Sequence, residues 1–186
     1  MSISAGTIRR VDRDYVQQWL PLLDQWLLHG AFYGVQQTWP QLYRNDGDGA
    51  FFVMLDEDRL LSHCACRIEK LHEGDKVTTI GLLGSVTTAP HVRGLGFAGQ
   101  LLSAAIESLS AQTDTILLWA ERPELYARQG FGQTGDDRCL LMVRRPFRAT
   151  STVRLLEITD YRAVHALHEC KPRRISRSLR TMSTLL

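Results

Sequence analysis

The clearest chemical signal in the sequence is a glycine-rich junction between a strand and a helix. The strand ends at Thr88, and Arg93, Gly94, Gly96 and Ala98 open the helix. The first amides of a helix have no intrahelical partner and carry the positive end of its dipole, and glycine lets a ligand approach the backbone closely. Arg93 adds a positive charge beside these amides. The junction is therefore a predicted anion site, and a pyrophosphate suits it.

The spacing of Gly94, Gly96 and Gly99 also matches a dinucleotide-binding motif, with Glu121 downstream as an acceptor for ribose hydroxyls. In that fold the first glycine follows the strand directly, whereas here residues 89–93 intervene. The upstream strands also read as an antiparallel meander instead of a second βαβ half. We therefore favour a pyrophosphate site of another fold. A glycine-rich helix start that binds no ligand is the remaining alternative.

The elements that must position this junction follow from hydrophobic periodicity and turn residues. Three strands between residues 50 and 88 form a meander, and residues 77–120 form a right-handed βαβ unit with parallel strands. The full predicted order is a strand at 6–11, a helix capped by Asp14 and broken or kinked at Pro21, a short helix at 39–43, strands at 50–55, 60–68 and 77–88, a helix at 94–112, a buried strand at 115–120, a short helix at 123–128, and a hairpin of 131–134 with 138–143.

Composition favours an ordinary cytoplasmic domain. The chain has 186 residues, of which 44% are hydrophobic and 23% charged, so its core needs neither a metal nor a disulfide. No apolar run approaches the roughly 20 residues that cross a bilayer, and the N-terminus lacks the apolar core of a signal peptide. Cys64 and Cys66 share one face of a strand. With His63 they only faintly resemble a metal site, and we expect core packing and no metal.

Charge is distributed unevenly along the chain. Residues 144–186 contain ten Lys and Arg against three Asp and Glu, and residues 1–143 contain 12 against 17. This basic tail lacks the interleaved aromatic residues that stack on bases, so we expect a solvated or domain-contacting face and no nucleic acid as its partner. Because no apolar run is long enough to cross a bilayer, we expect no membrane partner either. The acidic body weakly favours a cationic substrate.

Two motifs together resemble the GCN5-related N-acetyltransferases (GNAT superfamily). One is Arg93-Gly-Leu-Gly-Phe-Ala, and the other is Leu125-Tyr-Ala-Arg-Gln-Gly-Phe131. The element order is similar as well, over about residues 5–145. The resemblance implies an α/β (α+β) fold with a mixed sheet of about seven strands, a splayed parallel pair and about four flanking helices. It also implies a GNAT domain over residues 1–145.

The resemblance implies acetyl-CoA as the donor and a primary amine of a small molecule or protein as the acceptor. The pyrophosphate would lie on the backbone of Arg93, Gly94, Leu95, Gly96, Phe97 and Ala98. The pantetheine would pair like an extra strand with Val86, Thr87 and Thr88, because its amides can satisfy free strand groups. Tyr126 would protonate the departing thiolate, as in the family. The alternative function is a non-catalytic acyl-CoA-binding regulatory module.

Other roles stay open in the sequence. Glu121, Glu124 and His63 are candidates for the general base, with a water chain as the alternative. Trp119 stands where the family often has an asparagine, which puts one cofactor contact in doubt. Five aromatic residues either line an acceptor cleft or pack in the core: Trp26, Phe32, Tyr33, Trp39 and Tyr43.

Residues 146–186 form a basic C-terminal extension. A strand-like run starts at Val153, and residues 160–169 and 176–186 have helical periodicity. The extension resembles the start of a second lobe, as in the aminoglycoside-modifying and survival-factor branch of the acetyltransferases. It either packs back on the domain, joins a second copy in a homo-oligomer, or marks the chain as a fragment.

Overall fold

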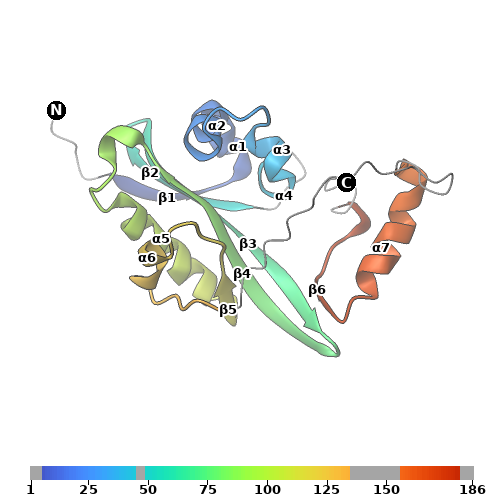
Figure 1. Cartoon of the computed structure of the whole chain (residues 1–186). Helices are drawn as coiled ribbons and strands as arrows, with labels where there is room; N and C mark the ends of the chain where they lie inside the picture. The colour runs from blue at the N-terminus through green and yellow to red at the C-terminus, as the bar shows by residue number, and fades with distance from the viewer. Residues whose placement is uncertain (1–5, 45–48, 135–155, 181–186) are drawn as a thin grey trace, which may run out of the picture.

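The computed structural model describes residues 6–44, 49–134 and 156–180, and it contains a six-stranded mixed sheet (Figure 1). The strands lie in the order β1-β2-β3-β4-β5, and β6 also pairs with β3. Among the described strands only β4 and β5 run parallel, so the predicted meander, βαβ unit and α/β fold class are confirmed. The strands are β1 (Thr7–Val11), β2 (Ala50–Asp56), β3 (Arg59–Glu73), β4 (Lys76–Thr88), β5 (Thr115–Leu117) and β6 (Arg173–Ile175).

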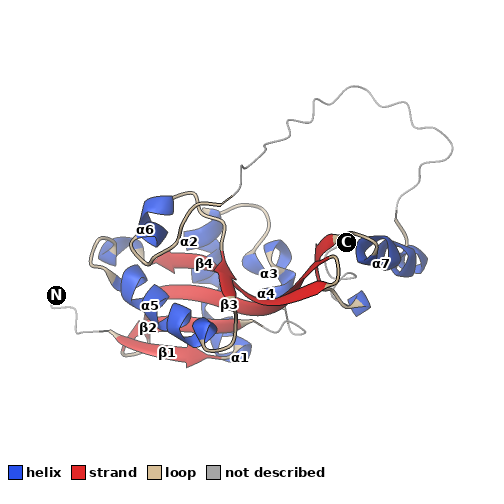
Figure 2. Cartoon of the chain, turned by 90° about the horizontal axis from the view of Figure 1, so that it is seen from below, coloured by secondary structure: helices blue, strands red, loops and turns tan. Residues whose placement is uncertain are grey.

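Helices cover both faces of the sheet. One face holds α1 (Arg13–Val16), α2 (Leu20–Leu28), α3 (Val35–Thr38) and α4 (Pro40–Tyr43), and the other holds α5 (Phe97–Ser110) and α6 (Pro123–Ala127) (Figure 1). The β3–β4 hairpin extends past this body, and α7 (Tyr161–Glu169) lies beside its far end (Figure 2). Single 3₁₀ turns occupy Gln17–Trp19, Pro90–Val92 and Ile158–Asp160.

Alternation along β2 explains why there are two cores. Phe51 and Val53 pack with the helices of the first face, whereas Phe52 and Met54 pack with α5. Successive side chains of a strand point to opposite faces, so a strand that is apolar at every position is buried on both. Cys64 and Cys66 lie in the α5 core, which confirms their predicted packing role.

The N-terminal helix differs from the prediction at its start. Asp12 caps α1, because its Oδ1 accepts a hydrogen bond of 2.9 Å from the Tyr15 amide; the predicted cap, Asp14, lies inside the helix. The predicted break at Pro21 is confirmed. The chain passes through the 3₁₀ turn at Gln17–Trp19, and Pro21 lies in the first turn of α2, where a missing N–H costs nothing.

Two further expectations are wrong in their bounds, and a third is wrong for the first of its two strands. The long helix begins at Phe97, because Gly94 and Gly96 have φ of +85° and +81°. The strand predicted at 115–120 ends at Leu117, and Trp119 and Ala120 are exposed. Residues 131–134 form no strand, and their predicted partner at 138–143 lies outside the described residues.

The C-terminal extension packs back on the hairpin. The helix predicted at 160–169 is confirmed as α7, but β6, which was not predicted, follows it. β6 pairs antiparallel with β3, with Leu71 opposite Ile175, and Arg173 forms an ion pair of 2.9 Å with Glu73. The helix predicted at 176–186 starts later than expected, because Ser176–Ser178 are not helical, whereas Leu179 and Arg180 are. Residues 181–186 and the run from Val153 lie outside the described residues.

Adjacent leucines on α2 test its docking on the sheet. Leu23 is fully buried, whereas Leu22 is 38% exposed. We expect Leu23→Ala to lower the free energy of unfolding by about 2–5 kcal/mol, because it removes buried methyl groups and leaves a cavity. Leu22→Ala should change it by less than about 1 kcal/mol. Urea unfolding measures both, and equal losses would contradict this packing.

Candidate functional site

A bulge interrupts β4 next to the predicted site. Ala65 of β3 lies opposite Gly84, and His63 lies opposite Thr87, so Ser85 and Val86 together oppose the single residue between them on β3. Ser85 has a φ of +50°, in the left-handed region that side chains rarely adopt. An extra residue of this kind bends the strand and disrupts the ladder locally.

The parallel pairing of β4 with β5 ends three residues before the bulge. β5 pairs with β4 only at Ile80–Leu82, and β3 covers the other edge of β4 through Thr88. In the part of the chain that the structure describes, no strand pairs with the β5-side edge of Val86–Thr88. Peptide groups on that edge are therefore available to a ligand that forms hydrogen bonds like a strand.

The glycine-rich turn lies directly after this open edge. The first helical bond of α5 runs from the Gln100 amide to the Gly96 oxygen at 3.2 Å, so the amides of Phe97–Gly99 precede any intrahelical acceptor. A Cβ at Gly94 or Gly96 would meet no atom within 4 Å. Both glycines are needed for their positive φ, and open space surrounds them. An anion can approach this helix start.

Arg93 ties the turn to the strand. Its Nε donates a hydrogen bond of 3.0 Å to the Thr88 oxygen, and its side chain is exposed. The bond fixes the distance between the open edge of β4 and the start of α5. The predicted cofactor residues of the strand and of the turn are thus brought together in one continuous segment.

Tyr126 lies on α6, half-buried against the α5 core. Its ring meets the edge of Phe131 with centroids 6.2 Å apart, and its carbonyl accepts the Gln129 and Phe131 amides at 2.8 and 3.2 Å. Burial, and then the nearby Cys64, raise the pKa of the Tyr126 phenol above its ordinary value of 10.0. A phenol is protonated at neutral pH even at its ordinary pKa, so Tyr126 carries a proton there, and burial makes that proton harder to release.

Gln129 joins α6 to α5, a link that the sequence did not reveal. Ser103 Oγ donates to Gln129 Oε1 at 3.0 Å, and Gln129 Nε2 donates to the Gly99 oxygen at 3.3 Å. These bonds fix Tyr126 relative to the glycine-rich turn. In the sequence this link is visible only as a glutamine inside the Tyr126 motif, and a glutamine by itself does not indicate which groups it will bond.

The candidate bases do not meet at one place. Glu121 and Glu124 are exposed near α6, while His63 is fully buried on the opposite face of the sheet. Burial lowers the pKa of His63 to about 4, and the backbone bond to Ser85 acts in the opposite direction. A neutral, buried imidazole of this kind is a poor proton acceptor.

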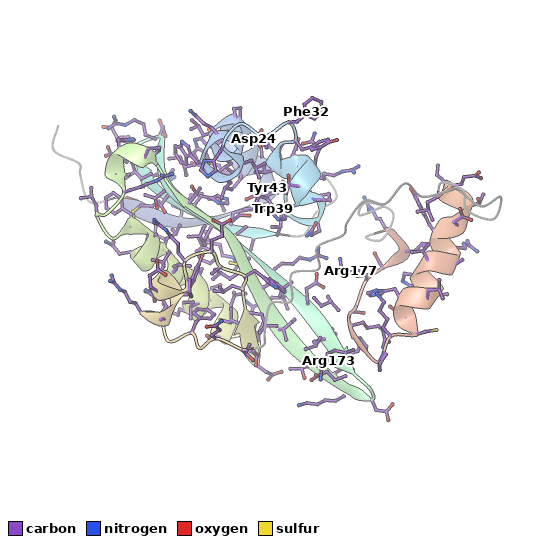
Figure 3. All side chains as sticks on the ribbon, in the orientation of Figure 1. Asp24, Phe32, Trp39, Tyr43, Arg173 and Arg177 are labelled. Atoms are coloured by element: carbon purple, nitrogen blue, oxygen red, sulfur yellow. The ribbon has the colours of Figure 1, made fainter. Side chains whose placement is uncertain are left out.

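The five aromatic residues divide between core and surface. Tyr43 is buried, and Trp26 and Trp39 are half-buried against the cores, so the core-packing alternative holds for Tyr43. Phe32 and Tyr33 are 94% and 63% exposed on the loop between α2 and α3. Asp24 anchors that loop by accepting the Val35 amide at 2.6 Å (Figure 3).

Two negative findings apply to residues 6–44, 49–134 and 156–180. They contain no group of three His, Cys, Asp or Glu side chains arranged to hold a metal ion. No helix within them combines the length and the apolar character needed to cross a membrane.

The lowered pKa of His63 gives the fold a pH dependence. In the unfolded chain His63 takes up a proton below pH 6.5, but in the folded chain it does so only below about 4. The stability that depends on a neutral His63 is therefore complete above pH 6.5 and is lost as the pH falls from 6.5 to about 4. It amounts to about 3 kcal/mol.

We expect urea unfolding to show a steeper loss of stability on acidification in the wild type than in His63→Asn. The other titrating groups are common to both proteins and cancel in the difference. Parallel pH curves would show that the His63 pKa is not lowered.

Comparisons with known proteins agree with this fold. A solved structure of a predicted acetyltransferase with acetyl-CoA from Clostridium acetobutylicum is 16% identical, with a TM-score of 0.58, over 73% of this chain and 96% of that one. Glucosamine-6-phosphate N-acetyltransferase from Arabidopsis thaliana is 13% identical, with a TM-score of 0.55, over 75% and 100%. A GCN5-related N-acetyltransferase from Ralstonia eutropha is 16% identical, with a TM-score of 0.58, over 73% and 98%.

No curated protein matches the chain. The dinucleotide interpretation is wrong, because β4 belongs to an antiparallel meander and the described sheet has one parallel pair. A family model for the acetyltransferase (GNAT) domain matches residues 7–134, a span that includes the open edge, the glycine-rich turn and Tyr126. The chain belongs to the GNAT acetyltransferase family.

Proposed function

We propose that this protein is an acetyl-CoA-dependent N-acetyltransferase that transfers acetyl directly to a primary amine of a small molecule or protein. The observation that carries the proposal is the open edge of Val86–Thr88 beside a helix start whose first amides have no intrahelical acceptor. An amide-rich arm ending in a pyrophosphate needs both features, in this order along the chain.

The residues present fit such a donor. Arg93, Gly94, Leu95, Gly96, Phe97 and Ala98 would hold the pyrophosphate through their backbone, with Arg93 adding charge. Val86, Thr87 and Thr88 would hold the pantetheine as an added strand. The positive φ values and open surroundings of Gly94 and Gly96 support this assignment, because a ligand must approach the backbone closely there.

Acetyl-CoA supplies an activated acetyl group, and this chain supplies orientation and a proton. Tyr126 donates its phenol proton to the thiolate that leaves when the amine attacks the thioester carbonyl. A backbone N–H near Thr88 stabilises the charge that develops on the carbonyl oxygen. The position of the Tyr126 phenol supports the donor role, because it is half-buried on α6 against the α5 core and, like any phenol, carries its proton at neutral pH.

The functional unit that we propose is a GNAT domain over residues 1–145 followed by the basic extension of 146–186. Pairing of β6 with β3 supports an extension that packs on its own domain. The described cysteines Cys64, Cys66 and Cys170 are free thiols, which suits the reducing cytoplasm where we expect the protein to act.

A pair of substitutions at Gly96 tests the pyrophosphate site. Gly96→Asp places a carboxylate beside the phosphate groups, so we expect it to abolish acetyl-CoA binding, measured by calorimetry. Gly96→Asn is the matched control, since asparagine has nearly the same shape and tolerates a positive φ without the charge. It should retain most of the affinity. Equal affinity of folded Gly96→Asp and Gly96→Asn would remove the pyrophosphate from this turn.

Tyr126→Phe tests the acid. Because it removes only a hydroxyl, the melting temperature and the acetyl-CoA affinity should persist, while kcat falls by about 10²-fold or more. The rate is measured by thiol release with the amine that a substrate panel identifies. An unchanged kcat would take the acid role from Tyr126. Acetyl-CoA binding by the wild type without turnover on any amine would favour a regulatory module.

A further inference from the structure

His63 lies directly beneath the bulge of β4. Its Nδ1 is 2.9 Å from the Ser85 carbonyl oxygen, and its side chain is completely buried. A carbonyl oxygen only accepts hydrogen bonds, so Nδ1 must carry the proton in this pair. The bond therefore joins a fixed donor on β3 to the residue of β4 whose φ is +50°.

Aromatic rings hold the imidazole in place. The Tyr43 ring stacks on it with centroids 6.1 Å apart and an interplanar angle of 27°, and Phe51 lies 5.8 Å away. The other ring nitrogen, His63 Nε2, is buried and has no hydrogen-bond partner among the described residues. A half-satisfied imidazole is costly in a core, where an apolar side chain of similar size packs without that penalty. The bond from Nδ1 is what an apolar residue could not supply.

The conformation of Ser85 decides which backbone N–H and C=O groups of Val86–Thr88 face the open edge. Successive peptide groups of a strand point to opposite edges, so insertion or loss of one residue exchanges the groups that face each side. With the bulge in place, Thr87 and Thr88 keep their register with His63 and Ser62 of β3. Loss of the bulge would turn outward the peptide groups that now pair with β3, and turn inward those of the open edge.

We propose that His63 is a positioning residue that holds Ser85 in the left-handed bulge and so sets which peptide groups of Val86–Thr88 receive the donor. This inference rests on the proposed function, because it assigns the open edge to acetyl-CoA. His63 does not touch the reacting atoms. It acts through the backbone of Ser85.

Three variants separate the hydrogen bond from simple packing. His63→Leu keeps most of the volume and removes the donor. His63→Asn retains a donor, because its Nδ2 takes a position close to that of Nδ1. The double variant His63→Leu with Ser85→Gly lacks the bond, but glycine adopts a positive φ without strain. Each is assayed for acetyl-CoA affinity by calorimetry, for melting temperature, and for the backbone φ at position 85 by three-bond NMR couplings.

We expect His63→Leu to weaken acetyl-CoA binding by about tenfold or more and to shift the φ of Ser85 to extended values. His63→Asn and the double variant should both bind within about threefold of the wild type. Restoration by Ser85→Gly is the decisive result, because glycine does not refill a packing defect at position 63. It applies even if His63→Leu alone is too unstable to assay.

Wild-type affinity and an unchanged φ of Ser85 in folded His63→Leu would overturn the positioning role. So would a double variant that folds and binds as weakly as His63→Leu. Neither result would affect the proposed function, which fails separately if the wild type does not bind acetyl-CoA.

Discussion

One extra residue in β4, held by the hydrogen bond from His63 to the Ser85 oxygen, is the constraint on which the rest of the site depends. Up to Leu82 the strand pairs with β5, and after the bulge it has an unpaired edge among the described residues. The helix that follows starts with amides that have no intrahelical acceptor, and the Arg93 bond ties the turn before it to the end of this edge. A sheet with uninterrupted parallel pairing would satisfy those strand groups internally and leave nothing for a ligand.

Both cores fix the geometry around the bulge. On one face Tyr43 and Phe51 pack on the imidazole, and on the other Cys64 lies in the core that supports Tyr126. The Gln129 bonds then hold α6 against the start of α5. The chemical groups of the site therefore come from β4, the turn that opens α5, and α6, and side-chain contacts within the two cores keep them in place.

Much of this arrangement follows from local sequence. Patterns among neighbouring residues predict three of its features. The apolar runs of the strands predict the meander, the apolar face of α5 predicts the βαβ unit, and the Gly94–Gly96 pair predicts the anion site. The bulge, by contrast, needs Ser85 of one strand and His63 of another, at a register that only the assembled sheet defines. The same holds for β6, which joins β3 through a pairing distant in sequence. The helix cap at Asp12 and the bonds of Gln129 depend on the exact positions of single side chains, which the sequence pattern does not specify.

Site-resolved hydrogen exchange of the wild-type protein, with and without saturating acetyl-CoA, tests the account most directly. The account predicts that acetyl-CoA slows exchange at amides of Val86–Thr88 that face the open edge, together with those of Gly94–Ala98. The amides of Ile80–Leu82 are already within the paired sheet and should change little. Binding of acetyl-CoA that protects another surface and leaves both segments unchanged would contradict it.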